Sequence, residues 1–143
     1  LACLTDFEGG EIDLTKEGLL MAPPYAILKL LARQQKQLSS FDTLELHEAF
    51  AAQVLCNLAA VQSPQWSNSK VGLPPTDIPI HDRINPRGVS IAIGHPFAAT
   101  GTRIVAILAA HLAETKQKSG LVSICAAGGL GLVATLEEYK RST

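Results

Sequence analysis

The sequence has little charge and no long hydrophobic run. Of its 143 residues 17% are charged, where an average globular domain has about a quarter, and its net charge is -1. Such a chain has no electrostatic attraction for nucleic acid or for an anionic membrane surface. The longest apolar run, Ile104 to Ala110, is far shorter than the ~20 residues that span a bilayer. We therefore expect no nucleic-acid partner and no membrane span, but one globular domain with a sizeable core.

Cysteine is also scarce. The chain has three: Cys3, Cys56 and Cys125. They are too few and too scattered for a disulfide framework, which indicates a reducing compartment. The pair His47-Glu48 begins like the zinc motif H-E-x-x-H, but Ala51 stands where the second histidine ligand is required. We expect no metal site.

Hydrophobic periodicity predicts an α/β domain over residues 1–143, with a mixed sheet and helices on both of its faces. The predicted strands are 1–8, 41–46, 89–93, 121–126 and 130–136, and the predicted helices are 24–35, 48–61 and 96–113. The proline-rich residues 62–87 are expected to form a long surface loop. In the predicted helix 96–113, the run "RIVAILAAHLA" is apolar around nearly its full circumference. Such a helix is buried on all sides, so we expect the chain to pack against a second domain.

A histidine lies at the junction between a strand-like run and a helix-like run. His95 lies between Gly94 and Pro96, and the start of a helix disfavours imidazolium. A neutral ring there could accept a proton. The alternative is a packed, hydrogen-bonded core histidine. His47 ends the strand 41–46 and suits either a structural or a polar-site role, while Glu48 is expected to be a helix-start carboxylate.

Cys125 ends an apolar strand and is followed by "AAGG". These glycines free the backbone to turn and present N–H groups, as an oxyanion site requires. The alternative is a buried small hydrophobe. The run 129–134 imitates a dinucleotide fingerprint, but the nine residues that follow it are too few for the rest of a βαβ unit. We expect structural roles for His81 and His111 and packing roles for Cys3 and Cys56.

Three motifs occur in a characteristic order: "HEAFAAQ" (47–53), "GHPFAATGTR" (94–103) and "CAAGGLG" (125–131). Together they resemble the C-terminal half of a thiolase, the family that makes and breaks carbon–carbon bonds between acyl-CoA thioesters. Most of the family has Asn at the position of His47. A histidine there resembles the thiolase subunits of fatty-acid oxidation complexes and of the mitochondrial trifunctional protein.

The resemblance implies a role for each matching residue. His95 would activate a nucleophilic cysteine and help to bind the thioester oxygen, and Cys125 would be the acid/base at the acetyl-CoA carbanion. His47 would hold a water or a donor beside His95. The backbone N–H of Ala127, which replaces a family glycine, would help to hold an oxyanion. Further substrate-binding positions would be Gly94, Phe97 and Gly128.

The resemblance also implies what the chain works with. The nucleophile would lie in an N-terminal thiolase domain that this chain lacks, so the chain alone is expected to be inactive. Coenzyme A would be a substrate, with no cofactor. Expected partners are acyl-CoA, the N-terminal domain, a further copy in a homodimer or tetramer, and a hydratase/dehydrogenase subunit. The alternatives are a non-catalytic fragment that binds a partner or acyl-CoA, and a ketoacyl-synthase-like condensing enzyme.

Two features bear on location. Asp6 and Glu8 interrupt the N-terminal apolar run, and no basic residues precede it, so no secretory signal is expected. The chain starts at Leu1 rather than Met, which favours a processed product or a piece of a longer protein. The resemblance implies the bacterial cytoplasm or the mitochondrial matrix.

Overall fold

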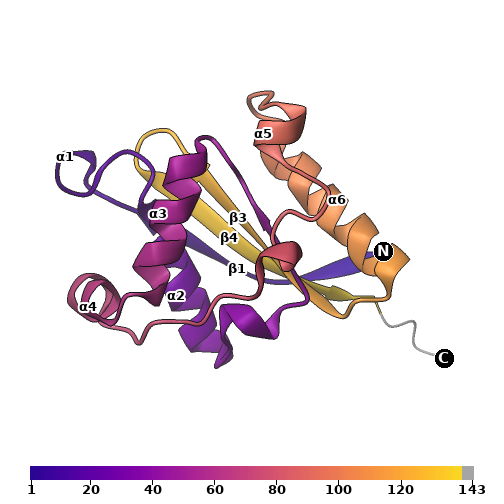
Figure 1. Ribbon diagram of the computed structural model, residues 1–143, viewed down its shortest axis with the longest axis horizontal. Coiled ribbons are helices and arrows are strands. Elements are labelled where there is room, and N and C mark those ends of the chain that lie inside the picture. The colour runs from indigo at the N-terminus through magenta and orange to yellow at the C-terminus, as the bar shows by residue number, and fades with distance from the viewer. Residues whose placement is uncertain (140–143) are drawn as a thin grey trace.

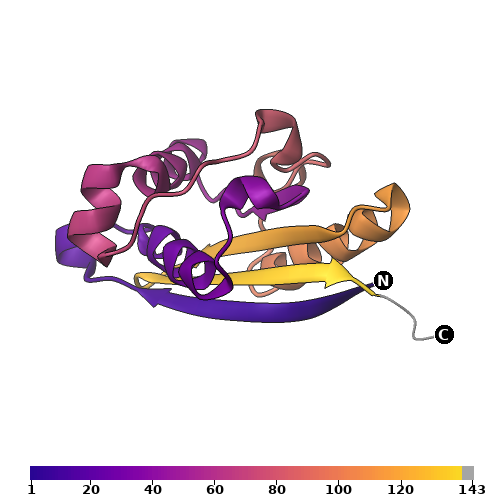
Figure 2. The same cartoon turned by 90° about the horizontal axis from the view of Figure 1, so that it is seen from below.

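The computed structural model describes residues 1–139, so residues 140–143 of the domain predicted over 1–143 lie outside the described part. Its four strands form one sheet in the order β1-β4-β3-β2. Their bounds are β1 (Ala2–Glu11), β2 (Thr43–Leu46), β3 (Ser119–Ala126) and β4 (Leu130–Glu138). β2 runs parallel to β3, and the other two pairs are antiparallel. Figure 2 shows β1 as the outer strand beside β4. The mixed sheet is confirmed.

Helices cover both faces of this sheet. In Figure 1 the strands run between α2 and α3 on one side and α6 on the other. The bounds of these helices are α2 (Ala22–Gln34), α3 (Ala51–Gln62) and α6 (Thr100–Thr115). The short turns are α1 (Leu14–Glu17), η1 (Leu38–Ser40), α4 (Pro64–Trp66), η2 (Ser67–Val71), η3 (His81–Arg83) and α5 (Ser90–Ile93). The predicted helices on both faces are therefore confirmed.

The alternation of strand side chains explains the two layers. Leu121 and Val133 point to one face and join the apolar cluster of α2, whereas their neighbours Val122 and Ala134 point to the other and join that of α6. Each buried Leu or Val contributes roughly 1.5–3 kcal/mol by leaving water. α6 buries one side against the sheet, through residues such as Ile104.

The region between α3 and α6 differs from the sequence prediction. Residues 62–87 contain α4, η2 and η3 rather than only loop, and residues 89–93 form the single turn α5 rather than a strand. The edge of β2 that faces away from β3 is occupied, because Leu44 pairs with Ile84 and accepts a hydrogen bond from the Asn85 N–H. Strand propensity depends on such context. α6 begins at Thr100 rather than at residue 96, since residues 96–99 form a turn.

Adjacent glycines of β1 give a matched test of how α2 packs on the sheet. A Cβ on Gly10 would lie 2.5 Å from the backbone oxygen of Ala22 in α2, while a Cβ on Gly9 meets nothing within 4 Å. We expect Gly10→Ala to lower the free energy of unfolding by about 1–3 kcal/mol, the usual cost of overpacking. Gly9→Ala should leave it nearly unchanged. Urea unfolding checks both, and equal effects of the two substitutions would contradict this packing.

Candidate active site

Three of the predicted site residues meet at one end of the sheet. His47 directly follows β2, and Cys125 lies near the end of β3. Because these strands are parallel, with Leu46 opposite Ser123, they end at the same edge, and the His47 N–H donates to the Ser123 carbonyl at 2.8 Å. His95 follows α5, and its ring centroid is 4.2 Å from that of His47.

An open cleft of about 630 Å³ connects these groups. Both histidines and Cys125 line it. Its walls are otherwise mainly apolar and include Leu19, Phe50, Phe97 and Ala127. The predicted positions Gly94 and Gly128 are not among its lining residues. A cleft with apolar walls and a few convergent polar groups is typical of a site for a small organic ligand.

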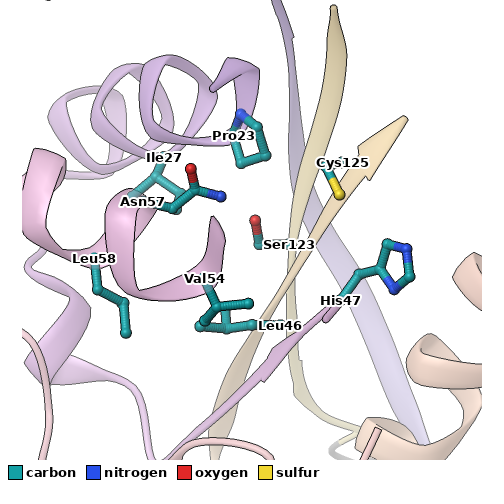
Figure 3. Close-up of a pocket in the computed structure, with 9 residues that line it drawn as sticks. All are labelled: Pro23, Ile27, Leu46, His47, Val54, Asn57, Leu58, Ser123 and Cys125. Atoms are coloured by element: carbon teal, nitrogen blue, oxygen red, sulfur yellow. The ribbon is translucent and has the colours of Figure 1, made fainter. Parts of the chain in front are cut away.

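A second, much smaller cavity lies behind the cleft. It measures about 20 Å³ and is lined by residues of α2, α3 and the strand ends (Figure 3). His47 and Cys125 line both spaces, so they form the wall between the open cleft and the interior. Figure 3 shows His47, Ser123 and Cys125 among the residues that line this cavity.

His47 is held as a neutral ring. It is only 5% exposed, and its Nδ1 lies 2.7 Å from the Ser90 Oγ. Burial lowers the pKa of His47, the neighbouring His95 and Arg103 lower it further, and Glu48 acts in the opposite direction. A neutral imidazole can act as a hydrogen-bond donor through one nitrogen and an acceptor through the other.

His95 is oriented by the first residue of α6. Its Nδ1 lies 2.7 Å from the Thr100 Oγ1, and the Thr100 hydroxyl donates to the Pro96 carbonyl at 3.2 Å. Since that hydroxyl has one proton, both bonds form together when His95 Nδ1–H is the donor. This tautomer leaves Nε2 free to accept a proton.

The expected position of His95 at a helix start is wrong, and so is the alternative of a packed core histidine. The His95 side chain is exposed to the cleft rather than buried, and it lies five residues before the first residue of α6 rather than at a helix start. The effect of a helix dipole falls off within the first turn. The hydrogen bond to the Thr100 hydroxyl therefore orients this ring.

Cys125 is a buried thiol. Burial raises the pKa of Cys125, while backbone hydrogen bonds, including one from Ala49, lower it in part. A thiol with a raised pKa keeps its proton at neutral pH and is a proton donor. The turn after it passes through Gly128 and Gly129, with φ of 91° and 77°, which only glycine adopts without strain. This turn brings Ala127 to the cleft.

Other predicted roles change in the structure. Glu48 is not at the start of α3, which begins at Ala51. Instead it accepts hydrogen bonds from the Asn85 side chain and from the Ile91 N–H. Cys3 and Cys56 are exposed rather than packed. Sequence reasoning missed Asn85 and the two hydroxyls that hold the histidines, because nothing in their spacing marks them.

The remaining histidines lie outside the cleft. His111 is buried in α6, where its Nδ1 accepts from the Arg87 Nε at 3.2 Å. His81 is exposed in η3. Over residues 1–139 no cluster of three or more His, Cys, Asp or Glu side chains could hold a metal ion. None of the helices in that range has the length and apolar character needed to cross a membrane.

Comparison with known families identifies the class. The family model of the thiolase C-terminal domain matches residues 1–138. The chain therefore belongs to the thiolase family, as its C-terminal domain.

Similar proteins are about 40% identical to this chain over most of its length. The mitochondrial trifunctional enzyme subunit beta is 39% identical in Bos taurus and 38% in Homo sapiens, over 132 residues that cover 88% of this chain and 27% of each relative. A 3-ketoacyl-CoA thiolase of Alteromonas mediterranea is 42% identical over 122 residues, which cover 85% of this chain and 28% of that protein. The chain thus spans little more than a quarter of the relatives it matches.

The lowered pKa of His47 implies that the free energy of unfolding depends on pH. Below the ordinary histidine pKa of 6.5 the unfolded chain binds a proton that the folded chain resists, so this histidine reduces stability as the pH falls. We expect the free energy of unfolding to fall more steeply between about pH 7.5 and 5.5 in the native protein than in His47→Asn. Urea unfolding across this range measures it. His111, whose pKa is also lowered by burial, is present in both proteins and cancels. Parallel pH profiles would contradict the assignment.

Proposed function

We propose that this chain is the C-terminal catalytic half of an acyl-CoA thiolase, which cleaves a 3-ketoacyl-CoA with CoA to acetyl-CoA and a shortened acyl-CoA. The observation that carries the proposal is the convergence of His47, His95 and Cys125 on one apolar cleft. This reaction needs a base for a nucleophilic thiol and a separate acid for the departing carbanion. The free Nε2 of His95 and the protonated Cys125 match these two needs.

The first half of the reaction uses both groups. His95 takes the proton of a cysteine in the N-terminal domain, and the resulting thiolate attacks the ketone carbon of the substrate. The carbon–carbon bond breaks, and its electron pair stays with the acetyl-CoA fragment as an enolate. Cys125 gives its proton to that carbon. In the second half, the Cys125 thiolate takes the thiol proton of CoA, and the CoA sulfur attacks the acyl-enzyme to form the shortened acyl-CoA. The departing cysteine thiolate takes back the proton that His95 holds.

The other predicted residues serve binding. His47, neutral and fixed by Ser90, holds a water or donates directly beside His95, where the thioester oxygen would lie. The Ala127 N–H stabilises an oxyanion. Phe97, 85% exposed in this chain, packs against substrate. Gly94 and Gly128 keep the two loops of the site free of side chains, so that a thioester can approach the backbone.

Exposed apolar side chains on one face of the sheet support the proposal that an N-terminal domain docks there. Phe7, Leu130 and Leu132 are 62%, 50% and 43% exposed. Strand alternation places them on the face of the sheet that carries α6. Contiguous apolar surface of this kind marks an interaction site. Since the chain spans 27% of the trifunctional beta subunits, we infer that the preceding domain of such a protein covers this face and supplies the nucleophile.

The wider setting follows from the relatives. They include mitochondrial and bacterial proteins, so we propose a place in fatty-acid β-oxidation in the mitochondrial matrix or the bacterial cytoplasm. Coenzyme A is a substrate, and no cofactor takes part. One group of relatives is named as a subunit of a trifunctional enzyme, which supports a partner subunit. We propose that this partner is a hydratase/dehydrogenase subunit and that the thiolase forms a homodimer or tetramer.

Substitutions in the full-length protein test the catalytic roles. We expect His95→Ala and Cys125→Ala each to lower kcat for cleavage of a long-chain 3-ketoacyl-CoA by about a hundredfold to ten-thousandfold, the usual contribution of acid–base catalysis. The exposed His81 and Cys56 supply matched controls, and His81→Ala and Cys56→Ala should keep full activity. Loss of substrate absorbance on addition of CoA gives the rate. Full activity of Cys125→Ala would favour a ketoacyl-synthase-like mechanism instead.

A second substitution tests the apolar face. We expect Leu132→Glu to prevent binding of a separately produced N-terminal domain, because a buried unpaired carboxylate is costly. Leu55→Glu is the control, since Leu55 is 64% exposed on α3, which covers the opposite face of the sheet. Isothermal titration calorimetry measures both. Normal binding by Leu132→Glu would show that the N-terminal domain docks elsewhere.

A further inference from the structure

Asn85 occupies the free edge of β2 immediately before His47. Its backbone N–H donates to the Leu44 carbonyl at 2.8 Å. Its side chain then completes the ladder at Leu46: Oδ1 accepts from the Leu46 N–H at 2.7 Å and Nδ2 donates to the Leu46 carbonyl at 3.0 Å. Asn85 has a φ of 50°, in the left-handed region that Asn tolerates better than most residues. One residue thus holds the strand end from which His47 projects.

Glu48 links Asn85 to α5, the turn that precedes the second histidine, His95. Its Oε1 accepts from the Asn85 Nδ2 at 2.8 Å, and its Oε2 accepts from the Ile91 N–H at 3.1 Å. Ile91 lies in the first turn of α5, where a carboxylate is favoured by the free N–H groups and by the dipole. α5 ends at Ile93, and His95 follows after one glycine.

The α5 turn is anchored at its start by Val89, which is fully buried in the apolar cluster of α6, but the turn itself buries little. A single helical turn is not stable by itself, and the side chains of Ile91 and Ile93 are 62% and 54% exposed. Only Ser90 is buried in this turn, and its hydroxyl meets His47. The link through Glu48 and Asn85 therefore adds a polar anchor at the start of α5. It acts beside the Ser90–His47 contact and the Thr100 hydroxyl in setting where His95 lies relative to His47.

We propose that Asn85 and Glu48 form a clamp that fixes the spacing of the two histidines, and that both act as positioning residues for catalysis. This inference rests on the proposed function. The clamp consists of side-chain hydrogen bonds that join the end of β2 to α5. Neither residue lines the cleft, so neither is expected to touch the substrate.

Asn85→Gly in the full-length protein tests the clamp. Glycine accepts a φ of 50° without strain, so the substitution removes the side chain and leaves the backbone conformation available. We expect kcat to fall by about tenfold to a hundredfold, as small displacements of reacting groups do, with the KM for CoA unchanged. Gln35→Gly is the matched control, because Gln35 also has a left-handed φ, of 54°, but lies at the end of α2. It should keep full activity.

A second measurement does not depend on activity. In ¹⁵N-histidine NMR titrations, we expect the pKa of His47 to rise toward its ordinary value in Asn85→Gly, because a loosened strand end exposes the ring and moves it away from His95. Gln35→Gly should leave that titration unchanged. If Asn85→Gly lowers only the melting temperature, with kcat and the His47 titration unchanged, the clamp is overturned. If the unsubstituted protein cleaves no 3-ketoacyl-CoA, the proposed function fails, and the titration alone decides the clamp.

Discussion

The parallel pairing of β2 with β3 is the constraint on which the site depends. It brings the ends of two strands that are far apart in sequence to one edge, so that His47 and Cys125 lie together although 77 residues separate them (125 − 47 − 1). Without this pairing, the histidine motifs and the cysteine motif would not form a site. α6 and its preceding turn then add His95, whose ring Thr100 holds. Loss of the β2–β3 register by one residue would turn His47 to the opposite face of the sheet.

Burial gives the two inner groups their chemical states. His47 and Cys125 form the wall between the cleft and the interior cavity, and both are kept uncharged by the cost of desolvation. His95 is different, because it faces the open cleft and is controlled by a hydrogen bond to a hydroxyl. A protonated thiol and an oriented imidazole therefore lie within one site. The second domain inferred above would close the cleft and strengthen the electrostatic interactions inside it by excluding water.

Much of this arrangement is readable from sequence, and the failures have physical causes. The two-residue alternation of β3 and β4 and the helical spacing of α2 predict the layers, and three motifs predict which residues share a site. The apolar residues of the segment 89–93 suit a strand, but the edge of β2 that such a strand would need is occupied by Ile84 and Asn85. Glu48 was placed at a helix start for a similar reason: its true partners, Asn85 and Ile91, are contacts between segments that local patterns do not encode.

The central claim is that this chain holds the base and the acid of a site whose nucleophile lies in another domain. The most direct test is CoA-dependent cleavage of a long-chain 3-ketoacyl-CoA by the chain alone and by the chain mixed with a separately produced N-terminal domain. We expect no cleavage by either polypeptide alone and cleavage by the mixture. Cleavage by this chain alone would contradict it, because the nucleophile would then be one of its own three cysteines.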